Sequence, residues 1–202
     1  MQIYIKSLDS TKKLLVFLIK NKRHLQSADC QKSNQRMNHI FLIGMMGAGK
    51  STVGSALAKE LTIPFIDTDE QIIHREGVSV SEIFRLKGEA YFRLLEQQII
   101  AHLPEEPSVV TCGGGLPCHG NQMAVLKQKG VVVYLEGSPE LLYKRIEKDL
   151  QRPLLKDFKA FKALLEQRQT FYKQAHLCIG IDRQVSDLIE ALKVKLVAEG
   201  LV

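Results

Sequence analysis

The 202-residue sequence predicts one α/β domain, in which a five-stranded parallel sheet is covered by helices on both faces as a three-layer sandwich. Three observations lead to this class. Short β-branched runs alternate with helical patterns from residue 38 onward. These runs are apolar nearly throughout, which is typical of parallel strands buried on both faces. The chain, 45% hydrophobic, is long enough for one well-packed core and too short for two comfortable domains.

Five segments carry the strand pattern, and helices are expected between them. In chain order the strands are His39 to Ile43, Pro64 to Asp67, Ser108 to Thr111, Val131 to Leu135 and Leu177 to Ile181. Two helices have recognisable starts. Ser79 and Glu82 form a capping-box pattern, and Ser138 precedes a proline that favours the first helical position.

Between the first strand and the next helix lies a run with the spacing G-x-x-x-x-G-K-[ST], from Gly44 to Ser51. Strand, glycine loop and helix follow in the order that a phosphate-binding loop requires. The glycines let backbone N–H groups surround a phosphate at the positive end of the helix. Lys50 is expected to reach the terminal phosphates, and the Ser51 hydroxyl to bind Mg²⁺. A glycine turn that binds nothing is the alternative. The expected nucleotide-binding residues are Gly47, Ala48, Gly49, Lys50, Ser51 and Thr52.

The second strand ends in Asp67-Thr68-Asp69. Ligands of open α/β sheets lie beyond the carboxyl ends of the strands. If the extended geometry continues, both carboxylates point to one side, where one can serve a metal and the other a substrate hydroxyl. The alternative is that Asp67 caps the following helix, which leaves a role for Asp69 open.

The third strand runs into Thr111 and then, after Cys112, into Gly113-Gly114-Gly115. Three successive glycines are costly in backbone entropy, so they suggest a sharp turn or a ligand in contact with main chain. A merely flexible loop is the alternative. The hydroxyl of Thr111 has the chemistry to bind a metal-bound water.

Two arginines lie among apolar residues on predicted helices, Arg93 and Arg168. The planar guanidinium suits bidentate capture of a carboxylate, although each residue taken singly also fits a solvated helix charge. Between two helices, the irregular segment from Asp149 to Leu155 is expected to close as a lid and bring Arg152 to the transferring phosphoryl group.

The net charge of +6 is confined to residues 1–37, which hold eight Lys/Arg against two Asp, whereas the rest of the chain holds twenty charges of each sign. The basic composition is therefore no argument for a nucleic-acid-binding domain. The apolar run from Leu14 to Ile19 is too short for a signal peptide or a membrane span. Residues 1–37 are expected to be a flexible extension, or to precede a true start at Met37. An arm that binds a membrane or a partner is the alternative. The four cysteines lack metal-site spacing and suggest free thiols in a reducing cytoplasm.

Taken as a set, the motifs resemble shikimate kinases over residues 38–202. The matching stretches are GMMGAGKST, FIDTDEQI, EIFRLKGEAYFRLLE, TCGGGLP, VVYLEGSPE, QRPLL and QRQTFY. The resemblance implies a nucleoside-monophosphate-kinase-like fold with strand order 2-3-1-4-5 and a mobile lid at about residues 147–159. It also implies transfer of the γ-phosphate of ATP, with Mg²⁺, to the 3-hydroxyl of shikimate. The expected protein is a cytoplasmic monomer with no nucleic-acid or membrane partner.

The resemblance also implies roles for individual residues. Asp69 matches the carboxylate that binds the substrate hydroxyls and acts as base, and Asp67 the carboxylate near Mg²⁺. For the phosphates, Lys50 and the lid residue Arg152 match the catalytic cations, and Arg145 an arginine that lies on adenine. On the substrate side, the matching residues are Arg93, Arg168 and Glu96 at the carboxylate, Gly113, Gly114 and Gly115 at the ring, and Phe84 and Phe92 as apolar walls.

Two other functions compete with this interpretation. Another small-metabolite kinase, such as a gluconate kinase, is not expected to combine D-T-D, F-R-x-x-E and G-G-G. A nucleotide-dependent regulatory module without catalysis is not expected to keep Lys50, Asp69, Arg93, Arg152 and Arg168 together.

Overall fold

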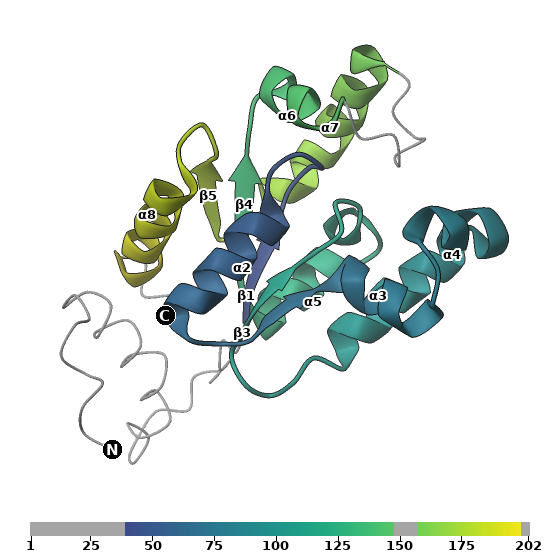
Figure 1. Cartoon of the computed structure of the whole chain (residues 1–202), viewed down its shortest axis with the longest axis horizontal. Coiled ribbons are helices and arrows are strands. Elements are labelled where there is room, and N and C mark those ends of the chain that lie inside the picture. Colours follow the sequence, from purple (N-terminus) through teal and green to yellow (C-terminus); the bar gives the residue numbers. More distant parts are fainter. Residues whose placement is uncertain (1–38, 148–156, 199–202) are drawn as a thin grey trace.

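All neighbouring strands of the sheet run parallel, in the order β2-β3-β1-β4-β5 (Figure 1). The structure, a computed structural model, describes residues 39–147 and 157–198. The strands are β1 (His39–Ile43), β2 (Phe65–Asp67), β3 (Ser108–Thr111), β4 (Gly130–Glu136) and β5 (Leu177–Gly180). The predicted parallel sheet and its strand order are confirmed.

Seven α-helices and one short 3₁₀ helix occupy the described residues. They are α2 (Lys50–Leu61), α3 (Thr68–Glu76), α4 (Val80–Ala101), η1 (Leu116–Cys118), α5 (Gln122–Lys129), α6 (Pro139–Ile146), α7 (Phe158–Tyr172) and α8 (Val185–Ala198). Helices α2 and α8 pack together on one face of the sheet, and α5 lies on the other, as right-handed crossovers require (Figure 1). The predicted layering is therefore present.

The two predicted helix starts differ in detail. The Oγ of Ser138 accepts a hydrogen bond from the N–H of Leu141 at 3.2 Å, with Pro139 at the first helical position. The Oγ of Ser79 accepts from the N–H of Glu82 at 3.2 Å, but the Glu82 carboxylate pairs with Arg85. Only the serine half of the predicted capping box is therefore formed.

Strand β2 starts one residue later than predicted because Pro64 has no N–H to donate to a ladder, although its carbonyl accepts from Val109 at 2.9 Å. Strand β5 ends one residue earlier than predicted, at Gly180.

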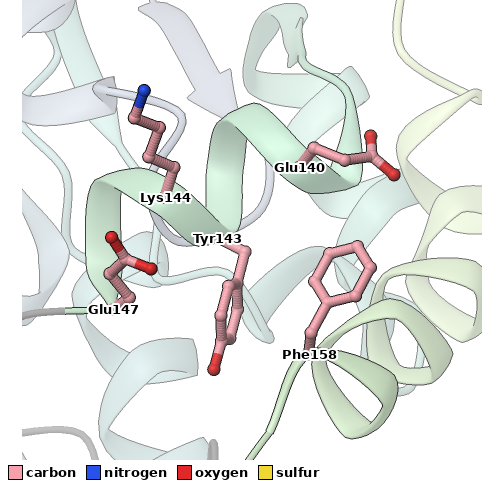
Figure 2. Close-up of a pocket in the computed structure, with 5 residues that line it drawn as sticks. All are labelled: Glu140, Tyr143, Lys144, Glu147 and Phe158. Carbon is pink, nitrogen blue, oxygen red and sulfur yellow. The ribbon is translucent and has the colours of Figure 1, made fainter.

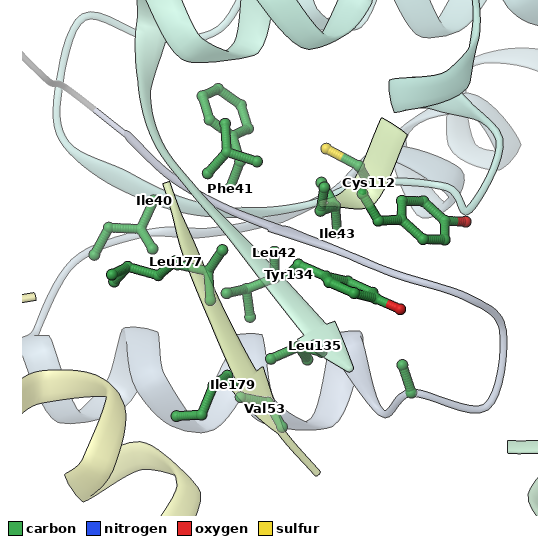
Figure 3. Packing of buried hydrophobic residues seen from close by; sticks show 14 of the residues in the cluster. Ile40, Phe41, Leu42, Ile43, Val53, Cys112, Tyr134, Leu135, Leu177 and Ile179 are labelled. Atoms are coloured by element: carbon green, nitrogen blue, oxygen red, sulfur yellow. The ribbon is translucent and has the colours of Figure 1, made fainter. Parts of the chain in front are cut away.

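The main core surrounds the central strands β1 and β4. All five residues of β1 are buried, and successive side chains point to opposite faces of the sheet. In Figure 3, Val53 of α2 lies near Leu135 and Ile179 beneath the sheet, whereas Phe41 and Cys112 lie above it. Burial on both faces explains why these strands read as continuous apolar runs.

A second, smaller core joins α3 to α4. Its buried members are Ile72, Ile83, Phe92 and Leu95, and none of them belongs to the main core. Helix α4 is interrupted within this region, because Gly88 has φ 80° and ψ 172°. Such a φ is far less costly for glycine than for other residues. The break separates the first turns of α4 from the part that carries Phe92 and Arg93.

Two further observations concern the length of the helices and the state of the cysteines. In residues 39–147 and 157–198, no helix has the length and apolar character needed to cross a membrane. Cys112, Cys118 and Cys178 are free thiols within the same ranges.

Candidate active site

The phosphate loop lies between β1 and α2, and two of its positions admit only glycine. Gly44 has φ 143° and Gly47 has φ 83°. A Cβ on Gly44 would lie 2.8 Å from the carbonyl oxygen of Leu135, and a Cβ on Gly47 2.5 Å from that of Leu142. The loop is thus packed directly on the backbone of β4 and α6. It leads through Gly49 (φ 78°) into the N-terminus of α2, so the predicted order of strand, loop and helix is present.

Lys50 is the first residue of α2, and its ammonium group reaches back over the loop. Its Nζ donates to the carbonyl oxygens of Gly44 at 3.0 Å and Met45 at 3.1 Å. These bonds hold a positive charge over the concave side of the loop, where a phosphate chain would lie. Within the loop, Ala48 is buried, and Ser51 and Thr52 follow on the exposed first turn of the helix.

Three oxygen-bearing side chains meet next to Lys50. The Oδ2 of Asp67 accepts a hydrogen bond from Ser51 Oγ at 2.7 Å and from Thr111 Oγ1 at 2.9 Å. A carboxylate and two hydroxyls form a hard-oxygen donor set that suits Mg²⁺. Within the described residues, no group of three or more His, Cys, Asp and Glu side chains is placed to hold a metal. A magnesium ion here would therefore need the hydroxyls, water and nucleotide oxygens as ligands.

The extended geometry considered for Asp67-Thr68-Asp69 is wrong. Helix α3 begins at Thr68, and Asp67 is its N-cap, with Oδ1 accepting from the N–H groups of Asp69 at 3.0 Å and Glu70 at 3.3 Å. The unpaired amides at a helix start favour this arrangement over a longer strand. The capping interpretation is correct, yet it leaves Oδ2 directed at Ser51 and Thr111. Asp69 lies in the first turn of α3.

The three glycines after β3 allow charged side chains from three helices to converge on one loop. A Cβ on Gly113 would lie 2.7 Å from Asp69 Oδ1 and 2.8 Å from Glu96 Oε1. A Cβ on Gly114 would lie 3.4 Å from Arg168 Nη1, and one on Gly115 would collide with the guanidinium of Arg93. None of the three glycines has a positive φ. Close approach of these side chains therefore explains the glycine run, and the flexible-loop alternative is wrong.

Arg93 is a partly buried ion-pair partner and not a solvated helix charge. Its side chain is 12% exposed. Nη1 donates to Glu96 Oε2 at 2.7 Å, while Nε at 3.1 Å and Nη2 at 2.8 Å donate to Glu89 Oε1. Burial alone would lower the pKa of Arg93, but these two carboxylates hold it above its usual value.

Glu89 was missed in the sequence, although a signal existed. It precedes Arg93 by four residues on α4, the spacing at which a carboxylate and a guanidinium face each other on a helix.

Glu96 is buried among these groups and has an unusual proton affinity. Burial raises its pKa to about 7, Arg93 opposes that shift, and the neighbouring Asp69 adds to it. Its Oε1 accepts no hydrogen bond from the part of the chain that the structure describes. Glu96 is therefore expected to hold its proton more tightly than an exposed carboxyl, and it neighbours both Arg93 and Asp69.

Arg168 connects this cluster to the phosphate loop. It projects from α7, with Nη1 3.8 Å from the Sδ of Met45 in the phosphate loop. One turn later on α7, the hydroxyl of Tyr172 donates to the carbonyl of Gly114 at 2.6 Å. Tyr172 thus holds the glycine run beside Arg168. No sequence signal pointed to this contact, which joins residues 58 positions apart.

Phe84 and Phe92 form an aromatic pair next to Arg93. Their ring centroids are 4.8 Å apart, and the Arg93 Cζ lies 5.5 Å from the Phe92 centroid. Phe92 is buried, while Phe84 is half-buried and presents apolar surface beside the charged cluster.

Arg145 on α6 bridges two backbone segments near the phosphate loop. Its Nη1 donates to the carbonyl of Gly47 at 3.3 Å and its Nη2 to that of Ile181 at 3.4 Å. It therefore lies between the loop and the segment after β5.

The lid prediction concerns residues that are mostly not described. Arg152 and residues 148–156 lie outside the described residues. Figure 2 shows a pocket of about 360 Å³ at the described ends of that segment, between α6 and α7. It is lined by Glu140, Tyr143, Lys144, Glu147 and Phe158, none of which is a predicted site residue.

The phosphate loop and the cluster of arginines and carboxylates around the glycine run define the class of protein. These features are those of a phosphate-loop kinase, in which the two arginines have the chemistry to hold a small anionic acceptor.

Comparison with known proteins agrees with this class and narrows it. The family model described as shikimate kinase matches residues 46–196. A curated shikimate kinase of Sulfurihydrogenibium sp. (strain YO3AOP1) is 41% identical over 163 residues, which cover 79% of this chain and 98% of that protein. The solved structure of a shikimate kinase from Acinetobacter baumannii in complex with shikimate has a TM-score of 0.77 at 32% identity, with 83% of this chain and 97% of that chain covered. The chain belongs to the shikimate kinase family and has the phosphotransferase activity of that family, with ATP as the phosphoryl donor.

A solved gluconokinase from Sinorhizobium meliloti 1021 shares the fold at a TM-score of 0.51. It is 20% identical over 81% of this chain and 95% of its own. This likeness concerns the fold alone, so the gluconate kinase alternative is not supported.

Proposed function

We propose that the phosphate loop and the cluster around Gly113–Gly115 are the donor and acceptor halves of one active site, in which the γ-phosphoryl group of ATP moves to the 3-hydroxyl of shikimate. One observation carries this proposal. Arg168 lies next to Gly114 in the glycine run and next to Met45 in the phosphate loop, so one side chain contacts both halves of the proposed site. Phosphoryl transfer requires such proximity, because the protein acts mainly by positioning the two reactants and balancing their charge.

On the donor side, the backbone N–H groups of residues 47–52 would bind the phosphates. Lys50 would exchange its two carbonyl partners for phosphate oxygens. Arg145, already next to the loop, would lie on the adenine, and the lid residue Arg152 would approach the transferring group. Ser51, Asp67 and Thr111 would hold Mg²⁺, directly or through water. The ion, when bound, supplies positive charge that balances the phosphate oxygens.

On the acceptor side, Arg93 and Arg168 would hold the shikimate carboxylate, with Glu96 orienting Arg93. The glycine run would let the ring approach the main chain, and Phe84 and Phe92 would cover its apolar edge. Asp69, whose Oδ1 is directed at Gly113, would bind the acceptor hydroxyl and accept its proton.

A coupled assay of ADP release tests the function as a whole. Release should depend on shikimate, and gluconate at equal concentration should not support it. Release that is indifferent to shikimate would contradict the proposal and favour a module that uses the nucleotide alone.

Asp67→Asn is expected to raise the Mg²⁺ concentration required for half-maximal activity, and high Mg²⁺ should restore part of the loss. The amide keeps an oxygen for the cap of α3 but loses the charge that would favour a metal next to Ser51 and Thr111. Mg²⁺ titrations of activity measure the effect. Asp187→Asn, a change in the first turn of α8, is the control. An unchanged Mg²⁺ profile would remove Asp67 from the metal site.

We also propose that residues 1–37 are a separate extension of a domain spanning 38–202, in a cytoplasmic monomer. Deletion of residues 1–37 is expected to leave kcat/KM within roughly tenfold of the full chain, because all the motifs that carry the chemistry lie after Met37. Steady-state kinetics and thermal unfolding of both forms measure this. A larger loss with the fold intact would indicate that the segment packs on the active site.

A further inference from the structure

The guanidinium of Arg93 has neighbours on all three of its edges. Nη1 donates to Glu96, and the edge formed by Nε and Nη2 donates to Glu89. The remaining end, formed by the two Nη atoms, faces Gly115. A Cβ on that glycine would lie 2.6 Å from Nη1 and even closer to Nη2. An incoming carboxylate that seeks two parallel hydrogen bonds therefore meets an arginine whose edges are already covered.

The two carboxylates on Arg93 differ sharply in their surroundings. The Glu96 side chain is 2% exposed, whereas the Glu89 side chain is 54% exposed. Glu89 also directly follows Gly88, where α4 is interrupted. An exposed carboxylate is rehydrated when it leaves its partner, while a buried one is not. Of the three neighbours, Glu89 is thus the one that can leave at low cost.

Groups other than Glu89 also fix the orientation of Arg93. The guanidinium is already held by Glu96 at 2.7 Å, backed by Gly115 and placed near the ring of Phe92. The Glu89 Oε1 that accepts from Arg93 also lies 3.3 Å from His119 Nε2, so Glu89 has a second polar neighbour besides Arg93. Movement toward His119 and the solvent would uncover the Nε and Nη2 edge of Arg93.

On the basis of the proposed function, in which Arg93 binds the substrate carboxylate, we propose that Glu89 is a built-in competitor. It occupies the edge of Arg93 that the substrate carboxylate takes, and it must leave before that carboxylate binds. Glu89 therefore sets the affinity for the acceptor without taking part in phosphoryl transfer. The ligand that Glu89 mimics is a small carboxylate. The effect of Glu89 on acceptor affinity cannot exceed the free energy of the partly exposed ion pair between Glu89 and Arg93.

The test is Glu89→Gln, with Glu89→Ala as a second variant in case the amide still binds Arg93. Each should lower the shikimate KM and the calorimetric Kd about two- to fivefold, which corresponds to about 0.4 to 1 kcal/mol. Glu82→Gln is the matched control, because Glu82 lies on the same helix, is 44% exposed and also pairs with an arginine, Arg85. It should leave both constants unchanged. Binding of the methyl ester of shikimate, which has no carboxylate charge, should respond little to Glu89→Gln.

Other outcomes separate this proposal from the assignment on which it rests. A rise in KM in both Glu89 variants would make Glu89 a residue that positions Arg93, and unchanged constants would show that it does not compete. Either result overturns the inference. Arg93→Ala tests the assignment itself. If this variant loses shikimate affinity while the Glu89 variants change nothing, the proposed function stands and the competitor fails. If Arg93→Ala binds shikimate normally, the proposed carboxylate site is wrong.

Discussion

Asp69→Asn is expected to lower kcat roughly 10²- to 10⁴-fold while ATP binding is retained. The amide has the shape of the carboxylate and leaves the backbone N–H of residue 69 bonded to Asp67, so α3 should remain in place. What it removes is the charge beside Gly113 that would hold the acceptor hydroxyl and take its proton. In a loose transition state the nucleophile is weakly bonded, so this positioning counts at least as much as basicity. Single-turnover kinetics with saturating ATP measure the loss.

Two comparisons make this prediction decisive. Additional Mg²⁺ should not restore activity to Asp69→Asn, in contrast to Asp67→Asn. The opposite pattern of metal responses would mean that the two carboxylates have exchanged roles. A kcat close to that of the unmodified enzyme would exclude Asp69 as the base.

Arg168→Ala is expected to weaken shikimate binding by about 2 to 5 kcal/mol, or roughly 30-fold to several thousandfold. The loss is large because the substrate carboxylate would be left half-paired in a site that already contains Asp69 and Glu96. ATP affinity should change little, since the contact of Arg168 with the phosphate loop is to the side chain of Met45. Calorimetric titration with each ligand measures both constants. Arg85→Ala, a change at an exposed helix arginine, is the control, and an unmoved shikimate Kd in Arg168→Ala would contradict the clamp.

The sheet could be predicted from sequence because its signal is local. Each strand is a short apolar run, and burial on both faces leaves no ambiguity about which residues face the core. The phosphate loop was predictable for a related reason. Glycine is required at positions 44 and 47 because φ is positive there and because an added Cβ would lie within 2.8 Å of a backbone oxygen. The backbone geometry of the loop therefore fixes the spacing of its glycines in the sequence.

Sequence patterns named described residues that the structure brings together in the candidate site, but not the contacts between them. Two interpretations of Asp67 competed, and the structure joins them, because one carboxylate oxygen caps α3 and the other meets Ser51 and Thr111. A sequence pattern assigns a single role to a residue, such as helix cap or metal ligand. The two oxygens of one carboxylate can nevertheless bind different partners, so both roles can hold at once.

Long-range contacts explain the remaining gaps. The bond from Tyr172 to Gly114 depends on how α7 crosses the end of the sheet, and no spacing rule expresses it. Glu89 was visible at a helical spacing from Arg93, but exposed pairs of this kind are common and most contribute little. Only the burial of Arg93 distinguishes this pair.

The presence of two separate cores affects how the sequence of such an enzyme can change during evolution. Asp69 and Arg93 are carried by α3 and α4 over the small core, while Lys50 is carried by α2 over the large one. Because the small core shares no buried side chain with the large one, its residues can be exchanged without opening a cavity beneath the phosphate loop. A lineage can therefore change the packing beneath Asp69 and Arg93 while the packing beneath the phosphate loop, and beneath Arg168 on α7, is inherited unchanged.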